Sequence, residues 1–253
     1  MGFDLLNISQ IDYKFGDTQI HQPTIYELGQ TLKEEQNLFF CLKIFSDSLK
    51  DMFDIFGAPS GIELHEYDYL YLLLSDNPLT KEKYAEQRVY LIQFLGLLFP
   101  NAEINIYQDN IMIKQNNIIS LIDKDNLLEF KNIVRKMFKL DFLFSGAGQT
   151  QEYNPVNEAA RKIAEKLKQS RAKVAAEKGE ENKIGIIENY VSILSVGLKT
   201  TPKYICETMT LYNLLTIFER FKLKMEWDLD IKVKLAGGGS DNHESPKVWF
   251  SII

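Results

Sequence analysis

At 253 residues, the chain is long enough for one large domain or two small ones. Its content of 45% hydrophobic and 25% charged residues is that of an ordinary globular protein, which excludes a fibrous chain and one disordered throughout. A formal net charge of −6 argues against a protein that captures nucleic acid over a broad basic face.

The first elements that we expect are a β-hairpin and a helix. Ile11–Gln22 alternates in the manner of two short strands, and Gly16 between them tolerates the positive φ of a tight turn. Thr24 and Glu27 have the spacing of a capping box, in which each side chain accepts a hydrogen bond from the other residue's amide. The apolar residues that follow predict an amphipathic helix from Thr24 to about Phe56.

A second helix is predicted further along. The stretch Ile62–Leu74 is so dense in tyrosine and leucine that no period decides between helix and strand. After it, Asn77 and Pro78 have the residue types of an N-cap and a first helical position. They predict a helix that runs to Phe99, where Pro100 stops it.

A small antiparallel sheet and a third helix complete the predicted N-terminal part. Glu103–Ile122 alternates in three short apolar pieces separated by polar turns, which predicts a three-stranded meander. Asp125 or Asn126 can cap a following helix over residues 127–138. Because strands and helices are segregated rather than alternating, residues 1–145 are predicted to form an α+β domain.

Residues 146–154 are polar and glycine-bearing, and we assign them as a linker to an all-α domain over 155–253. This domain begins with apolar residues three and four apart from Val156 to Val174, a spacing typical of a narrow helical seam. Residues 157–178 are also the one basic island in the acidic sequence. They form either a solvated linker helix or a protein-binding element, and the lack of aromatic residues between the basic ones argues against stacking on nucleic acid.

The rest of the C-terminal part is also predicted to be helical. A helix over Ile184–Leu198 ends at Thr200–Pro202. Thr208 or Thr210 then opens the last long helix, whose apolar residues continue to Leu235. The glycine-rich residues beyond it predict a flexible tail that ends in an apolar peptide.

No catalytic or metal-binding pattern accompanies these elements. Cys41 has the apolar spacing of a core residue, and Cys206 has no local group that would activate its thiol. His243 lies among acidic residues in the glycine-rich tail, which is not preorganised for a metal ion. We therefore expect no enzyme, no cofactor and no metal site. No apolar run approaches the length of a membrane-spanning helix, so we also expect no contact with a membrane.

Aromatic residues make up 12% of the chain, and core packing accounts for most of them. Rigid rings in the last helix and the tail are suited to anchor a protein partner, because they supply a large contact area at a low entropy cost. The alternative is that these rings pack on their own domain. The candidate anchors are Tyr212, Phe218, Phe221 and Trp249.

Several segments together resemble a known family. The closing part of the chain carries most of the resemblance, and the hairpin-to-helix block, the middle strands and the linker region add to it. The segments are Ile11–Asp17, Pro23–Glu27, Asp125-Asn126 with Phe130, Tyr153–Pro155, Met209–Tyr212, Phe218–Phe221, Trp227-Asp228, Lys234–Gly238 and Pro246–Trp249. They are similar to long tail-cluster proteins, regarded as tail assembly chaperones, of phages that infect low-GC Gram-positive bacteria.

The resemblance implies a non-enzymatic protein of phage tail morphogenesis that acts in the host cytoplasm. It implies binding to the tape-measure protein and recruitment of tail-tube subunits. The alternative is a structural component of the tail or baseplate that remains in the virion, and self-association is compatible with both. A cryptic enzyme or a nucleic-acid factor is a third class, which only the basic island supports.

Overall fold

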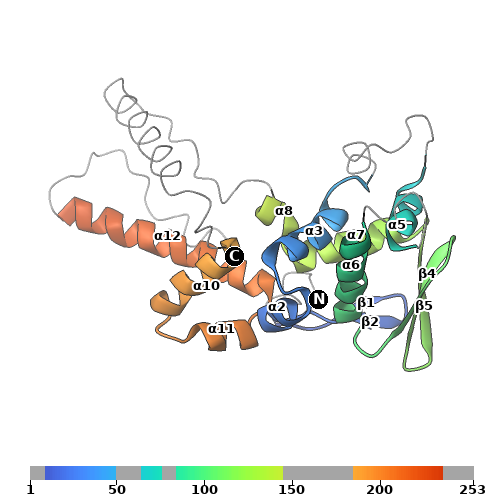
Figure 1. Cartoon of the computed structure of the whole chain (residues 1–253). Coiled ribbons are helices and arrows are strands. Elements are labelled where there is room, and N and C mark those ends of the chain that lie inside the picture. The colour runs from blue at the N-terminus through green and yellow to red at the C-terminus, as the bar shows by residue number, and fades with distance from the viewer. Residues whose placement is uncertain (1–8, 50–63, 76–83, 145–184, 236–253) are drawn as a thin grey trace, which may run out of the picture.

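The structure of the chain is a computed structural model that describes residues 9–49, 64–75, 84–144 and 185–235. A hairpin, a three-stranded antiparallel sheet and several helices form the N-terminal part, and helices form the described C-terminal part (Figure 1). The predicted order of an α+β part followed by a helical part is therefore confirmed.

The predicted N-terminal hairpin consists of β1 (Tyr13–Phe15) and β2 (Thr18–Ile20). Gly16 in its turn has a φ of 55°, which costs a glycine little. Ser120 of the second sheet lies against this turn, and its hydroxyl donates to the Phe15 carbonyl at 3.2 Å. A Cβ at Gly16 would lie 2.9 Å from the Ser120 Oγ, so the turn and the contact both require glycine.

The single helix predicted from Thr24 to Phe56 is wrong, because the chain turns at Lys33, whose φ is 64°. The cause is a change of phase in the apolar pattern. Leu32 and Leu38 are six residues apart, which would place their side chains on different faces of one continuous helix. The turn lets both side chains reach the core. The two helices that replace the prediction are α2 (Ile25–Leu32) and α3 (Glu35–Ser46).

Two further helices precede the second sheet. α5 (Glu66–Leu74) lies in the stretch Ile62–Leu74, for which the apolar pattern did not distinguish a helix from a strand. α6 (Ala85–Leu98) is the second predicted helix. α6 begins after Tyr84 at the N-cap position, later than predicted, and ends before Pro100 as predicted. The predicted start at Asn77–Pro78 and the predicted helical residues after Leu49 lie outside the described part of the chain.

The second sheet is the predicted three-stranded meander, with its strands in sequence order. Asn116 and Asn117 form the tight turn between the last two strands, with φ of 51° and 64°. One face of the sheet is buried in the core, whereas Ile119 and Leu121 on the other face are exposed. The strands are β3 (Glu103–Ile106), β4 (Asn110–Gln115) and β5 (Ile118–Asp123).

Asn126 precedes α7 (Leu127–Met137) at the N-cap position, but the predicted side-chain cap there is wrong. The Asn126 side chain turns to the sheet instead. It accepts a hydrogen bond from the Asp123 amide at 3.0 Å and donates one to the Leu121 carbonyl at 2.8 Å. These bonds satisfy backbone groups on the outer edge of β5, which would otherwise be open to pairing with another strand. The short helix α8 (Leu140–Phe144) follows α7.

Phe130 of α7 lies at the centre of the N-terminal core. Its ring contacts the rings of Phe15 and Phe45 edge-on, with centroids 5.3 and 5.6 Å apart, and stacks on Phe99 at 5.9 Å. These contacts bring the hairpin, α3 and the end of α6 onto one side chain. All four rings are fully buried.

Lys131 places an ammonium group at the edge of this core, where the residue is only 6% exposed. Its Nζ donates to the Asp47 carbonyl at 2.8 Å and to the Glu66 carboxylate at 2.6 Å. A buried ammonium without such partners would cost several kcal/mol. The charge therefore ties α7 to the end of α3 and the start of α5.

The described C-terminal residues contain a helix that was not predicted, α11 (Pro202–Thr208). Thr201 and Pro202, expected to end a helix, instead begin α11, and the Thr201 hydroxyl accepts from the Tyr204 amide at 3.2 Å. Of the two predicted openings of the last helix, Thr210 is correct, because its hydroxyl accepts from the Asn213 amide at 3.3 Å. The helices are α10 (Ile186–Gly197), α11 (Pro202–Thr208) and α12 (Leu211–Leu235).

The two parts of the described chain meet at α2. α11 packs against α2, and the two lie side by side in Figure 1. Thr24 and Thr210 form an isolated antiparallel bridge, in which the Ile25 amide donates to the Met209 carbonyl at 2.9 Å. Buried side chains from both parts belong to one apolar cluster. The linker over 146–154 lies outside the described residues, so the division into two domains stays a prediction.

The first testable prediction concerns the capping box, which is confirmed: Thr24 Oγ1 accepts from the Glu27 amide at 3.2 Å, and Glu27 Oε2 from the Thr24 amide at 2.7 Å. Thr24→Ala leaves the Glu27 amide without its acceptor and should lower the free energy of unfolding by about 0.5–2 kcal/mol. Urea denaturation measures the change. Thr31→Ala, within the same helix, is the control and should not destabilise. An unchanged midpoint for Thr24→Ala would show that the cap does not stabilise the fold.

Candidate partner-binding groove

A groove of about 470 Å³ lies between the α2–α3 turn and the helices α10 and α11. Its floor is apolar and its rim is charged. Apolar side chains that line it include Ile25, Leu28, Leu38, Ile187, Val191 and Leu211. The charged side chains are Lys33, Glu34, Glu35 and Glu188.

Glu35 fixes one end of the groove. Its carboxylate accepts hydrogen bonds from the first amides of α10, from Ile186 at 2.8 Å and from Ile187 at 3.3 Å. Gly185, the N-cap residue of α10, has no side chain that could cap the helix itself. A Cβ there would lie 2.0 Å from Glu35 Oε2, so glycine admits the carboxylate to the amides. A side chain of α3 thus caps α10, and this holds the two walls together.

The Glu35 carboxyl is in an unfavourable place for a negative charge. Burial raises its pKa above the ordinary value, and the nearby Glu188 carboxylate raises it further. The hydrogen bonds from the Ile187 and Ile186 amides act in the opposite direction but do not cancel the rise. Burial is thus the main reason that the charged form of Glu35 is disfavoured, and the Glu188 carboxylate adds to it.

Two residues of the groove are suited to experimental tests of it, one by substitution and one by labelling. Gly29 is an exposed residue in the middle of α2, and a Cβ there would have no atom within 4 Å. A side chain can therefore be introduced at Gly29, which lines the groove, with its Cβ in open space. Cys206 is partly exposed in the groove, whereas Cys41, the other cysteine of the chain, is fully buried.

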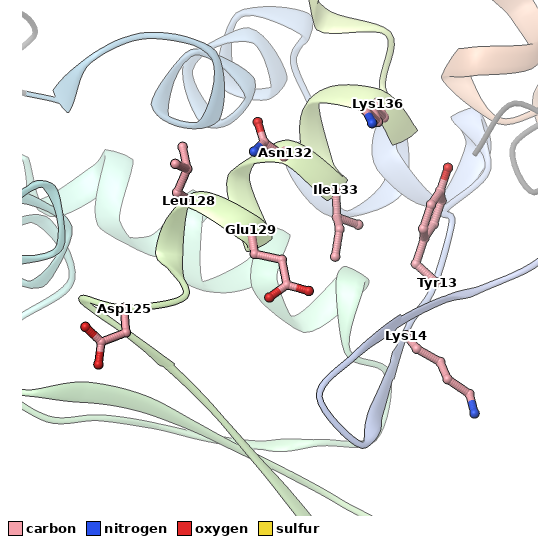
Figure 2. Close-up of a pocket in the computed structure, with 8 residues that line it drawn as sticks. All are labelled: Tyr13, Lys14, Asp125, Leu128, Glu129, Asn132, Ile133 and Lys136. Carbon is pink, nitrogen blue, oxygen red and sulfur yellow. The ribbon is translucent and has the colours of Figure 1, made fainter. Parts of the chain in front are cut away.

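A second hollow, of about 640 Å³, lies between β1 and α7. Figure 2 shows that the polar groups around it do not converge on a common point. The Lys14 and Asp125 side chains point away from each other, and the Glu129 carboxylate lies between them without reaching either. A bound ligand needs several polar groups aimed at one place, so we do not assign this hollow as a site.

The predicted anchors in α12 contact neighbouring helices of the same chain. The Phe218 ring stacks on Tyr190 of α10, with centroids 4.0 Å apart. Phe221 lies over Gly197, where a Cβ would come within 2.3 Å of the ring. Tyr212 is buried, 9% exposed, with the Lys139 ammonium 5.7 Å from its ring centroid. None of the three lines the groove, and Trp249 lies outside the described residues.

The described residues contain no cluster of three or more histidine, cysteine or acidic side chains able to hold a metal ion. Burial raises the pKa of the Cys41 thiol to about 12, and burial together with Glu207 also raises the pKa of Cys206. Both thiols are therefore protonated near neutral pH. No helix in the described part of the chain is long and apolar enough to span a membrane.

Comparison of the chain with protein-family models, with curated proteins and with solved structures found no match. Two of the groove residues, Leu28 and Leu38, could be recognised in the sequence, because each belongs to an apolar pattern of helical period. Nothing in the sequence indicated that α2 and α11 would meet, because the residues that join them are far apart in the chain.

The second prediction concerns the pH dependence that Glu35 contributes. Its pKa is raised in the folded state, so its favourable contribution to stability is complete below the ordinary value of 4.5 and is lost as the pH rises through the raised value. Glu35→Gln keeps an oxygen acceptor but removes the charge. From pH 4 upward, the wild type should therefore lose stability relative to Glu35→Gln, as measured by urea unfolding at each pH. A difference between the two proteins that is constant with pH would refute this effect of Glu35.

Proposed function

We propose that the chain is a non-enzymatic binding protein of phage tail morphogenesis. In this proposal it is an assembly chaperone that takes a helical segment of the tape-measure protein into the groove and recruits tail-tube subunits. The observation that carries the proposal is the apolar groove between α2–α3 and α10–α11. Recognition of an amphipathic helix in an apolar groove is a recurring mode of protein binding.

The shape and lining of the groove suit a helix. The walls are themselves helices, so a third helix can pack its apolar side chains between their ridges. Leu28 and Val191 are buried at the floor, and Tyr26 at the margin is 49% exposed. A partner that covers Tyr26 and the remaining apolar surface would gain roughly 25 cal/mol per Å² removed from water.

The choice of client rests on the resemblance of the chain to phage tail-cluster proteins. A tape-measure protein of such a phage is a long helical client, which matches the binding mode proposed for the groove. The same reasoning assigns the protein to the host cytoplasm, where tails are assembled. The alternative is a structural component of the tail or baseplate. Such a component would remain in the virion, but its groove would bind a partner in the same way.

The third prediction tests the groove with a pair of matched variants. Gly29→Leu fills the groove from α2, whereas Gly96→Leu makes the same change at an exposed position of α6 where a Cβ also has no atom within 4 Å. Both changes replace a helical glycine and should raise the stability by up to about 1 kcal/mol. Gly29→Leu should abolish co-purification with the co-expressed tape-measure protein, and Gly96→Leu should not. Equal recovery of the client by both variants would exclude the groove as its binding site.

The fourth prediction separates a chaperone from a virion component. A chaperone leaves the assembly before the particle is complete, so mass spectrometry of purified particles should detect no peptides of this chain. The tape-measure protein in the same sample is the positive control. Stoichiometric amounts of the chain in particles would favour the structural alternative instead.

A further inference from the structure

We propose that the helix received by the groove carries lysine or arginine beside its apolar stripe, and that it is held by the acidic rim as well as by the apolar floor. This inference rests on the proposed function and specifies the chemistry of the partner. It requires that the rim be negative, that its charges be available, and that they lie next to the apolar surface.

The rim is negative because three carboxylates outnumber one ammonium group. Glu34 and Glu35 lie at the turn between α2 and α3, and Glu188 lies in the first turn of α10. Lys33 is the basic side chain among the groove-lining residues. Burial is the main cause of the raised pKa of the Glu35 carboxyl, and the nearby Glu188 carboxylate adds to the rise.

Two of these charges are available to a partner. Glu35 is already engaged with the amides of α10. Glu34 and Glu188 are exposed, and within the described residues neither forms an ion pair with a basic side chain. Glu34 accepts a hydrogen bond from the Gln36 side-chain amide, a neutral group that brings no positive charge to the carboxylate.

The charges adjoin the apolar floor. Glu188 directly follows Ile187, and both residues line the groove. A helix that places apolar side chains on Ile187 and Leu38 therefore brings its flanking residues to Glu188 and Glu34. Basic residues at those flanking positions would meet opposite charges, and acidic ones would meet like charges. The acidic rim therefore selects among amphipathic helices that share the same apolar stripe.

The test uses two synthetic helical peptides of about five turns each. They share leucines at positions spaced by three and four, and they carry either lysine or glutamate at every flanking position. Binding is read from the rate at which a maleimide labels Cys206 in the full-length protein, since a helix in the groove covers this thiol. Cys41 does not interfere because it is fully buried.

The lysine peptide should protect Cys206 at a concentration about tenfold lower than the glutamate peptide. High salt should narrow this difference, because ions screen exposed charges. Equal protection by both peptides, or stronger protection by the glutamate peptide, would overturn the inference. So would protection that grows with protein concentration in the absence of peptide, which would identify a second copy of the chain as the occupant.

Matched charge reversals exclude simple attraction to an acidic protein. Glu188→Lys and Glu86→Lys change the net charge equally, and each replaces an exposed glutamate in the first turn of a helix, α10 or α6. Glu188→Lys should weaken protection by the lysine peptide by about threefold to tenfold. Glu86→Lys should leave it unchanged. Equal effects of the two substitutions would also overturn the inference.

The two proposals can fail separately. If both peptides protect Cys206 equally and Gly29→Leu abolishes both effects, the groove binds helices and only the preference for basic flanks is wrong. If Gly29→Leu leaves co-purification with the tape-measure protein unchanged, the proposed function is wrong whatever the peptides do.

Discussion

The bridge between Thr24 and Thr210 is the constraint on which the groove depends. Each threonine is the N-cap of a helix, and each hydroxyl accepts a hydrogen bond from the amide three residues further on. Because the two caps are joined through the Ile25 amide and the Met209 carbonyl, α2 and α12 begin at the same place in the molecule. This common origin sets α11 against α2, and Glu35 then fixes α10 at the other end. The two N-cap residues, each of which makes a hydrogen bond within its own helix, are thus joined in one tertiary contact.

Such local signals explain how much could be predicted from the sequence. The hairpin at Gly16, the capping box at Thr24 and the start of the last helix at Thr210 all depend on residues within four positions of one another, and the structure confirms them. The turn at Lys33 was missed although the step of six between Leu32 and Leu38 carried the signal. The groove could not be predicted in the same way, because its walls come from segments that are far apart in the chain and meet only in the folded structure.

The aromatic residues of the last helix were predicted to anchor a partner, but aromatic content alone is a weak guide to function. A ring on a helix predicts contact with something apolar, but it does not distinguish a partner from a neighbouring helix. Phe218 and Phe221 lie against Tyr190 and Gly197 of α10, so their contacts stabilise the wall of the groove. Their role as anchors for a partner stays a prediction. The contacts that they make in the chain already give them a part in any binding that depends on α10.

The distance along the chain between α2 and α11 has a consequence for synthesis on the ribosome. At usual elongation rates, roughly ten to forty seconds separate the translation of the first wall of the groove from that of the second. During that interval a nascent chain has Leu28 on α2 but no α11 to complete the site. A partner helix can therefore find a complete groove only after α11 has been translated. The order of translation itself thus sets the earliest moment at which the groove can bind, without any separate regulator.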